Sequence, residues 1–188
     1  MYIYLHGLNS SSNSYKVNWL RPRVSPREML SPTYPAHDAA LAIPALTKLV
    51  ENNIDKKPLV LIGSSLGGYY AQYLAQIYPC GIIFINPALL PSHELEKHKG
   101  LQTNYDGSQY ELTDAHLEKL EQLRVHSANP AIPSLLLVDE DDEVIDPKFA
   151  IQYLQGQAAM RIFPGGSHSF EHLEHALDDI VRFHDKLV

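Results

Sequence analysis

Short apolar runs alternate along the chain with segments in which hydrophobic residues recur every three or four positions. The apolar runs predict six strands, at Tyr2–Leu5, Glu28–Ser31, Leu59–Ile62, Gly81–Ile85, Ser134–Val138 and Met160–Phe163. The periodic segments predict helices at about Ser14–Leu20, Asp38–Asn53, Leu66–Tyr78, Pro147–Leu154 and Phe170–Leu187. The middle strands are apolar at consecutive positions, as expected where helices cover both faces of a sheet. The pattern therefore predicts an α/β fold, a doubly wound and mostly parallel six-stranded sheet.

The stretch between Pro87 and Pro133 interrupts this alternation, because the spacing between predicted strands roughly doubles there. It contains a polar piece, a turn and a helical pattern, at Ser92–Lys99, Asn104–Gly107 and Leu117–Leu123. We predict a small helical, cap-like insertion over residues 88–130 at the carboxyl edge of the sheet, where open α/β folds bind ligands. The alternatives are a long crossover without a role in binding, and leucines that only pack the core. With this insertion, residues 1–188 are expected to form one domain.

Composition narrows the possible partners and the compartment. The 188 residues carry 15 Lys and Arg against 22 Asp and Glu, so the formal net charge of −7 gives no electrostatic support to binding nucleic acid or an anionic membrane. The single cysteine, Cys80, cannot form an internal disulfide. No apolar run approaches the roughly 18 residues of a membrane span, and the chain starts on a strand pattern rather than a signal peptide. We expect a cytoplasmic protein.

The segment Gly63-Ser64-Ser65-Leu66-Gly67 joins an apolar run to a helical pattern. A serine on a strained strand-to-helix turn needs very small residues two positions before and two after it, because the two backbones pass close together. Gly63 and Gly67 meet this need, so Ser65 is predicted to be a nucleophile at the sheet edge, where the helix N-terminus favours negative charge. Ser64 is predicted to fill the turn. A glycine-rich turn without chemistry is the alternative.

The loop after the first predicted strand, Tyr4-Leu5-His6-Gly7-Leu8-Asn9, is expected to complete an acyl-transfer site. Such a site needs two backbone N–H groups for the oxyanion, one from the residue after the nucleophile and one from this loop. Leu66 and Leu8 are the predicted donors, because Gly7 lets the backbone approach. The His6 ring is predicted to hold the loop by hydrogen bonds, with a direct role as a base as the alternative.

The glycine-rich segment Pro164–Phe170 follows the last predicted strand and contains the candidate base. A base that serves a serine at a strand edge must come from a loop on the same edge, which favours His168. An alternative interpretation treats His168, His172 and His175 as metal ligands on one helix face. No carboxylate at ligand spacing accompanies them, so we expect no metal and no cofactor.

The candidate acid follows the penultimate predicted strand, where four aspartates are crowded together. Asp142 is the preferred candidate, and Asp141 is the second. Asp146 precedes Pro147, and an aspartate N-cap followed by proline at the first helical position explains it structurally. The resulting chain order of serine, acid and histidine is the one expected for this architecture.

These motifs resemble the α/β-hydrolase superfamily, and most of all its small YqiA-type esterases. The matching segments span nearly the whole chain and are His6–Ser11, Gly63–Gly68, Ile85–Ala88, Asp142–Val144 and Gly165–His168. The resemblance places the acid at Asp142, the nucleophile at Ser65 and the base at His168. It implies a fold that lacks the first two strands of larger hydrolases. It also implies hydrolysis of carboxylic esters, with cleavage of acyl-CoA thioesters as a further option.

The sequence therefore predicts a serine esterase that acts on a small-molecule ester through an acyl-enzyme. A thioesterase would need a basic patch for the phosphates of coenzyme A. Lys97 and Lys99 are the only candidates for such a patch near the insertion. A non-catalytic binding module that kept the pocket is the alternative from another class.

Overall fold

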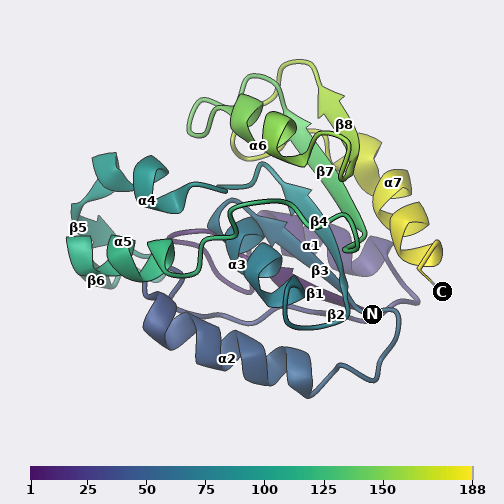
Figure 1. Ribbon diagram of the computed structural model, residues 1–188, viewed down its shortest axis with the longest axis horizontal. Coiled ribbons are helices and arrows are strands. Elements are labelled where there is room, and N and C mark those ends of the chain that lie inside the picture. The colour runs from purple at the N-terminus through teal and green to yellow at the C-terminus, as the bar shows by residue number, and fades with distance from the viewer. Residues whose placement is uncertain (188) are drawn as a thin grey trace.

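The computed structural model describes residues 1–187 and contains one six-stranded sheet in which every neighbouring pair is parallel (Figure 1). The strand order is β2-β1-β3-β4-β7-β8. These strands are β1 (Tyr2–Leu5), β2 (Met29–Leu30), β3 (Val60–Ser64), β4 (Gly81–Ile85), β7 (Ser134–Asp139) and β8 (Ala159–Phe163). The predicted doubly wound α/β fold is confirmed.

Helices cover both faces of the sheet, which explains why its central strands are apolar at consecutive positions. They are α1 (Tyr15–Arg23), α2 (Ala39–Glu51), α3 (Leu66–Ala75), α6 (Pro147–Leu154) and α7 (Leu173–Asp185). Successive strand residues point to opposite faces. Helices α1 and α7 lie on one face of the sheet, and α2, α3 and α6 lie on the other (Figure 1). Tyr2 and Tyr4 therefore pack with α1 and α7, whereas Ile3 and Leu5 pack with α2, α3 and α6.

Helix α7 begins three residues later than its apolar pattern predicts. Phe170 is fully buried but has a φ of +60°, a conformation that does not belong to an α-helix. Its apolar side chain packs edge-to-face against Phe163 of β8, with 5.7 Å between the ring centroids. Phe170 therefore belongs to the loop between β8 and α7, not to the helix.

The insertion is only partly helical. It contains α4 (Pro91–Glu94), a 3₁₀ turn η1 (Glu96–His98), an antiparallel hairpin of β5 (Gly100–Thr103) and β6 (Gln109–Leu112), and α5 (Asp114–Glu121). The middle part of the insertion is therefore a hairpin, which the hydrophobic pattern did not predict, between the helical parts. The predicted turn at Asn104–Gly107 joins the two strands of this hairpin.

The apolar face of α5 packs into the main core instead of lining a ligand cavity. Leu117 and Leu120 are buried in the same cluster as the residues of α3. The Tyr69 hydroxyl of α3 donates a hydrogen bond of 2.6 Å to the carbonyl of Leu120. The insertion is thus anchored to the body of the protein through α5.

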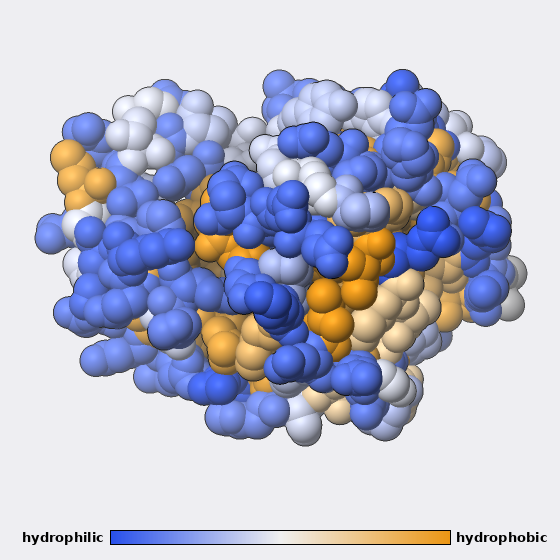
Figure 2. Space-filling view, turned by 90° about the horizontal axis from the view of Figure 1, so that it is seen from above, coloured by the Kyte–Doolittle hydropathy of each residue, from blue (hydrophilic) through white to orange (hydrophobic). Residues whose placement is uncertain are grey.

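Figure 2 shows a face of the molecule that is largely hydrophilic, with apolar residues visible in patches between hydrophilic ones. Within residues 1–187, no helix is both long enough and apolar enough to cross a membrane.

Candidate active site

Ser65 lies between the end of β3 and the start of α3 and has a φ of +53° and a ψ of −126°. Non-glycine residues rarely adopt a positive φ, so surrounding structure must hold this conformation. A Cβ atom on Gly63 would lie 2.5 Å from the Gly67 carbonyl oxygen, and one on Gly67 would overlap the carbonyl of Leu5. Ser65 is partly exposed, whereas Ser64 is buried. The structure therefore contains the predicted tight turn between strand and helix.

Hydrogen bonds connect Ser65, His168 and Asp142 in one chain. His168 Nε2 lies 3.1 Å from Ser65 Oγ, and His168 Nδ1 lies 2.8 Å from Asp142 Oδ2. The side chain of Asp142 is only 1% exposed and that of His168 is 23% exposed. A carboxylate at Nδ1 favours the tautomer that carries its proton there, which leaves Nε2 free to accept the serine proton.

The three competing aspartates have different surroundings. Asp142 Oδ1 accepts hydrogen bonds of 2.9 Å from the backbone N–H groups of Val144 and Ile145, which orient the carboxylate. Asp141 is exposed. Asp146 is the N-cap of α6 and accepts a hydrogen bond of 3.0 Å from the N–H of Lys148, as the sequence predicts. Of the three, only Asp142 bonds to His168.

A second buried aspartate, which sequence reasoning left without a role, holds the loop that carries His168. Asp139, at the end of β7, is fully buried. Its carboxylate accepts hydrogen bonds from Ser167 N (3.2 Å) and Glu171 N (2.7 Å) and pairs with His172 Nδ1 at 2.8 Å. Asn86, after β4, donates to the carbonyl of Ser167 at 2.8 Å. The signal in the sequence was the position of Asp139 and Asn86 directly after buried strands.

The histidines of the metal interpretation do not converge on one point. His168 pairs with Asp142, whereas His172 pairs with Asp139 and stacks on Phe163 with 4.9 Å between ring centroids. Among residues 1–187, no group of three or more His, Cys, Asp or Glu side chains is arranged to hold a metal ion.

The loop after β1 lies directly against the serine. A Cβ atom on Gly7 would lie 2.9 Å from Ser65 Cβ, so glycine is what allows this approach. Within the described chain, no residue accepts a hydrogen bond from the backbone N–H of Leu8 or of Leu66. Both residues line a cavity of about 180 Å³ together with Ser65. Two free donors thus border the cavity beside the serine hydroxyl.

The His6 ring belongs to the interior of this loop. Its Nδ1 lies 2.8 Å from the carbonyl of Gly7, and the ring stacks on Tyr34 with 4.2 Å between centroids. Burial lowers the pKa of His6. These contacts agree with the predicted role of holding the loop, and none of its hydrogen bonds reaches Ser65.

Ser65 and His168 line two cavities with different chemistry. The cavity of about 180 Å³ lies under the insertion, which contributes Glu94, Leu95, His98 and Gln102. Burial raises the pKa of Glu94 to about 7, so this carboxyl group is substantially protonated near neutral pH. The second cavity, of about 340 Å³, lies against the start of α1 and contains Lys16, which sequence reasoning missed.

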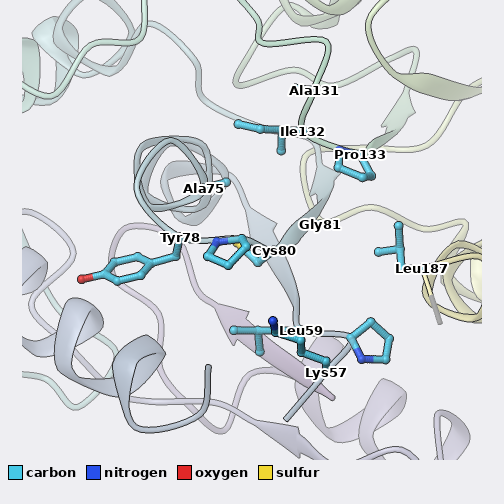
Figure 3. Close-up of a pocket in the computed structure, with 12 residues that line it drawn as sticks. Lys57, Leu59, Ala75, Tyr78, Cys80, Gly81, Ala131, Ile132, Pro133 and Leu187 are labelled. Carbon is cyan, nitrogen blue, oxygen red and sulfur yellow. The ribbon is translucent and has the colours of Figure 1, made fainter. Parts of the chain in front are cut away.

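A third cavity, of about 320 Å³, is lined by Cys80 and Gly81 (Figure 3). These two residues lie just before and at the start of β4, whereas Ser65 follows the end of the neighbouring parallel strand β3, so the cavity and the serine lie at opposite ends of the strands. Burial raises the pKa of the Cys80 thiol to about 12, so the thiol is protonated at neutral pH and a poor nucleophile. This cavity is thus remote from the serine.

The chain matches a sequence family over almost its full length. The model of the uncharacterised protein family UPF0227 matches residues 1–185. The UPF0227 protein YcfP of Escherichia coli (strain K12 / DH10B) is 34% identical over 101 residues, which cover 51% of this chain and 55% of YcfP. A UPF0227 protein of Enterobacter sp. (strain 638) gives the same values. These alignments span about half the length of the curated relatives that the chain matches.

Solved structures with low sequence identity share the fold. Est1E from Butyrivibrio proteoclasticus has a TM-score of 0.76 at 16% identity, with 99% of this chain and 87% of Est1E covered. The monoacylglycerol lipase of Paleococcus ferrophilus has a TM-score of 0.73 at 15% identity, with 100% and 94% covered. Mouse alpha/beta hydrolase domain-containing protein 10 has a TM-score of 0.69 at 20% identity, with 100% and 90% covered. These likenesses identify the α/β-hydrolase fold.

Proposed function

The chain belongs to the UPF0227 family, and from this membership and its α/β-hydrolase fold we propose that it is a serine hydrolase that cleaves carboxylic esters. The observation that carries the proposal is the chain of hydrogen bonds from Ser65 through His168 to Asp142, with distances of 3.1 and 2.8 Å. This geometry suits a nucleophile, a general base and an acid that orients the base.

The proposed reaction has two steps. His168 Nε2 takes the proton of Ser65 while Oγ attacks the ester carbonyl, and the N–H groups of Leu8 and Leu66 stabilise the oxyanion. His168 then protonates the departing alcohol, which leaves an acyl group on Ser65. In the second step His168 activates a water molecule that releases the acid. Asp142 holds the imidazole in the reactive tautomer and stabilises the imidazolium.

The names of the structural neighbours support ester substrates over other acyl compounds. Est1E has been solved with ferulic acid bound, and another neighbour is a monoacylglycerol lipase. A coenzyme A thioester has less support, because one of the two lysines near the insertion is already neutralised. Lys99 pairs with Glu96 and Asp114 at 2.5 and 2.8 Å, which leaves Lys97 alone for the phosphates.

We further propose that residues 88–130 act as a cap over the site within a single domain. Glu94 and Leu95 of α4 and its C-cap, His98 of η1 and Gln102 of β5 line the cavity that also contains Ser65. Contacts with the variable part of a substrate therefore come from α4, η1 and the hairpin, and not from the leucines of α5.

Substitution of the serine tests the proposal directly. Ser65→Ala should lower kcat for 4-nitrophenyl esters by a factor on the order of 10⁶, as loss of a triad nucleophile does. Ser64→Ala is the matched control, since it removes a neighbouring hydroxyl with no proposed catalytic role. If Ser65→Ala keeps activity within about tenfold, Ser65 is not the nucleophile. If folded protein fails to react with a fluorophosphonate probe at Ser65, a non-catalytic binding module is favoured instead.

A further inference from the structure

The cavity on the α1 side of Ser65 contains an ammonium group that ester hydrolysis does not require. Lys16 is partly buried there, and its Nζ donates one hydrogen bond of 2.8 Å to the carbonyl of Ser169. A lysine has three donors. Among residues 1–187, no carboxylate lies within ion-pair distance of Lys16, unlike Lys56 and Lys99. Burial lowers the pKa of Lys16 to about 8.

The rest of this cavity is suited to an anion. No aspartate or glutamate lines it within the described part of the chain, although the whole protein carries a net charge of −7. The hydroxyl-bearing residues among its lining are Tyr4, Ser10, Ser14, Tyr15, Ser64, Ser65 and Ser169. Hydroxyl groups can donate hydrogen bonds to the oxygens of a carboxylate or phosphate.

The start of helix α1 adds to this character. Ser14, Tyr15 and Lys16 line the cavity, and they form the N-cap and first two residues of the helix. Ser14 makes no side-chain cap hydrogen bond, and the first turn contains no acidic residue. The uncapped N–H groups and the helix dipole therefore favour negative charge at this end.

From the unpaired Lys16 ammonium, the acid-free lining and the uncapped helix end, we propose that the enzyme selects esters that carry a compact anionic group, a carboxylate or a phosphate. Lys16 binds this group in the cavity beside Ser65. The inference rests on the proposed ester hydrolysis and specifies its substrate class. The cavity of about 180 Å³ under the insertion takes the uncharged part of the substrate, because no lysine or arginine of the described chain lines it and its one carboxyl group, Glu94, is partly ionised near neutral pH.

Paired substrates separate the possible positions and kinds of anion. The mono(4-nitrophenyl) ester of adipic acid places a carboxylate on the acyl side, and 4-nitrophenyl hexanoate is its neutral partner. On the alcohol side, 4-acetoxybenzoate and 4-acetoxyphenyl phosphate are compared with phenyl acetate. The measured quantity is the ratio of kcat/KM for each anionic ester to that for its neutral partner. Comparing this ratio between variants cancels the intrinsic reactivity of each ester.

Lys16→Met should lower this ratio about 10- to 100-fold for at least one anionic ester, the value of a hydrogen bond to a charged group. Lys16→Arg should retain the preference. Lys48→Met is the matched control, because it removes one exposed lysine of α2 and changes the net charge equally. An equal loss on charged and neutral esters would mean that Lys16 only holds the Ser169 loop, which overturns the proposal. An unchanged ratio for every pair also overturns it.

A binding measurement keeps this inference separate from the proposed hydrolysis. Ser65→Ala protein can be titrated calorimetrically with monomethyl adipate, 4-hydroxybenzoate and phenyl phosphate, and with dimethyl adipate as the neutral control. Binding of an anion that Lys16→Met abolishes in the Ser65→Ala background supports the anion site at Lys16, and it does so even if the native protein cleaves no ester and the proposed hydrolysis fails. Hydrolysis of neutral esters without any anion binding would contradict the proposed selectivity but still support the proposed ester hydrolysis.

Discussion

The Asp142 carboxylate makes two sets of hydrogen bonds, and they predict how its substitution will act. Asp142 accepts from the backbone N–H groups of Val144 and Ile145 through Oδ1 and pairs with His168 Nδ1. Asp142→Asn keeps an acceptor oxygen for the backbone but lets the amide favour the wrong imidazole tautomer. We expect kcat to fall by a factor approaching 10⁴, with little change in the thermal denaturation curve.

Asp141 provides the control for that prediction. It precedes Asp142 directly but is exposed and bonds through its backbone N–H to the carbonyl of Gly165. Asp141→Asn should therefore have a mild effect on kcat. An equal loss of activity in both variants would contradict the assignment of the acid to Asp142.

The pKa of Lys16 predicts that the preference for anionic esters depends on pH. Burial lowers this pKa from 10.5 to about 8, while the carboxylates of Asp139 and Asp142 oppose the shift. The ammonium is therefore charged well below pH 8 and neutral well above it, so the preference should be lost as pH rises through about 8. His168 also lines this cavity, but as the proposed base it serves the anionic and the neutral ester alike.

The measurement is the ratio of kcat/KM for the preferred anionic ester and its neutral partner from about pH 6 to about pH 10. Lys16→Arg should keep the preference across this range, because a guanidinium stays charged. A ratio that falls in the same way for Lys16→Arg would assign the titration to another group.

At the scale of elements, the loop between β8 and α7 determines the position of His168. Asp139 binds this loop at Ser167, Glu171 and His172. A Cβ atom on Gly166 would overlap the Asp139 carboxylate, whereas one on Gly165 would meet nothing within 4 Å. Both glycines have a positive φ, of +75° and +80°. An alanine at either position would therefore strain the backbone, but only an alanine at 166 would also clash with Asp139.

Gly166→Ala should displace His168 and lower kcat by a factor on the order of 10², the effect of misplacing a catalytic group by about 1 Å. Gly165→Ala, the matched control, should cost about 1 kcal/mol of unfolding free energy and largely keep its activity. Kinetics and chemical denaturation of both variants test the pair. Similar kinetic damage in both would show that strain, and not contact with Asp139, positions the loop.

At the scale of the whole molecule, the sequence predicted what buried apolar runs and close backbone approach impose. Central strands covered on both faces must be apolar, and the turn at Ser65 must be flanked by small residues. The sequence therefore predicted both the strands and the turn. The hairpin β5–β6 was not predicted, because its strands are short, polar and half exposed. The contact of Lys16 with Ser169 was not predicted either, because the two residues lie 153 positions apart in the chain.

The same distant contacts predict that the insertion and the sheet unfold together. Leu120 of α5 is fully buried in the core cluster of α3, and its carbonyl accepts the hydrogen bond of the Tyr69 hydroxyl. Leu120→Ala should therefore lower the unfolding free energy by about 2–5 kcal/mol within a single cooperative transition. Leu101, on the hairpin of the same insertion, is 69% exposed, so Leu101→Ala should stay within about 0.5 kcal/mol of the native protein.

Urea denaturation followed by both circular dichroism and tyrosine fluorescence measures this difference. If Leu120→Ala keeps native stability and changes only the preference for acyl length, α5 would belong to a cap that lines the substrate cavity. That outcome would favour the interpretation of the insertion as a cap over the alternative that its leucines only pack the core. If instead the two probes separate in Leu120→Ala, the insertion unfolds before the sheet. The burial of Leu120 beside α3 argues for the joint transition, because removing its side chain leaves a void in the core that both parts share.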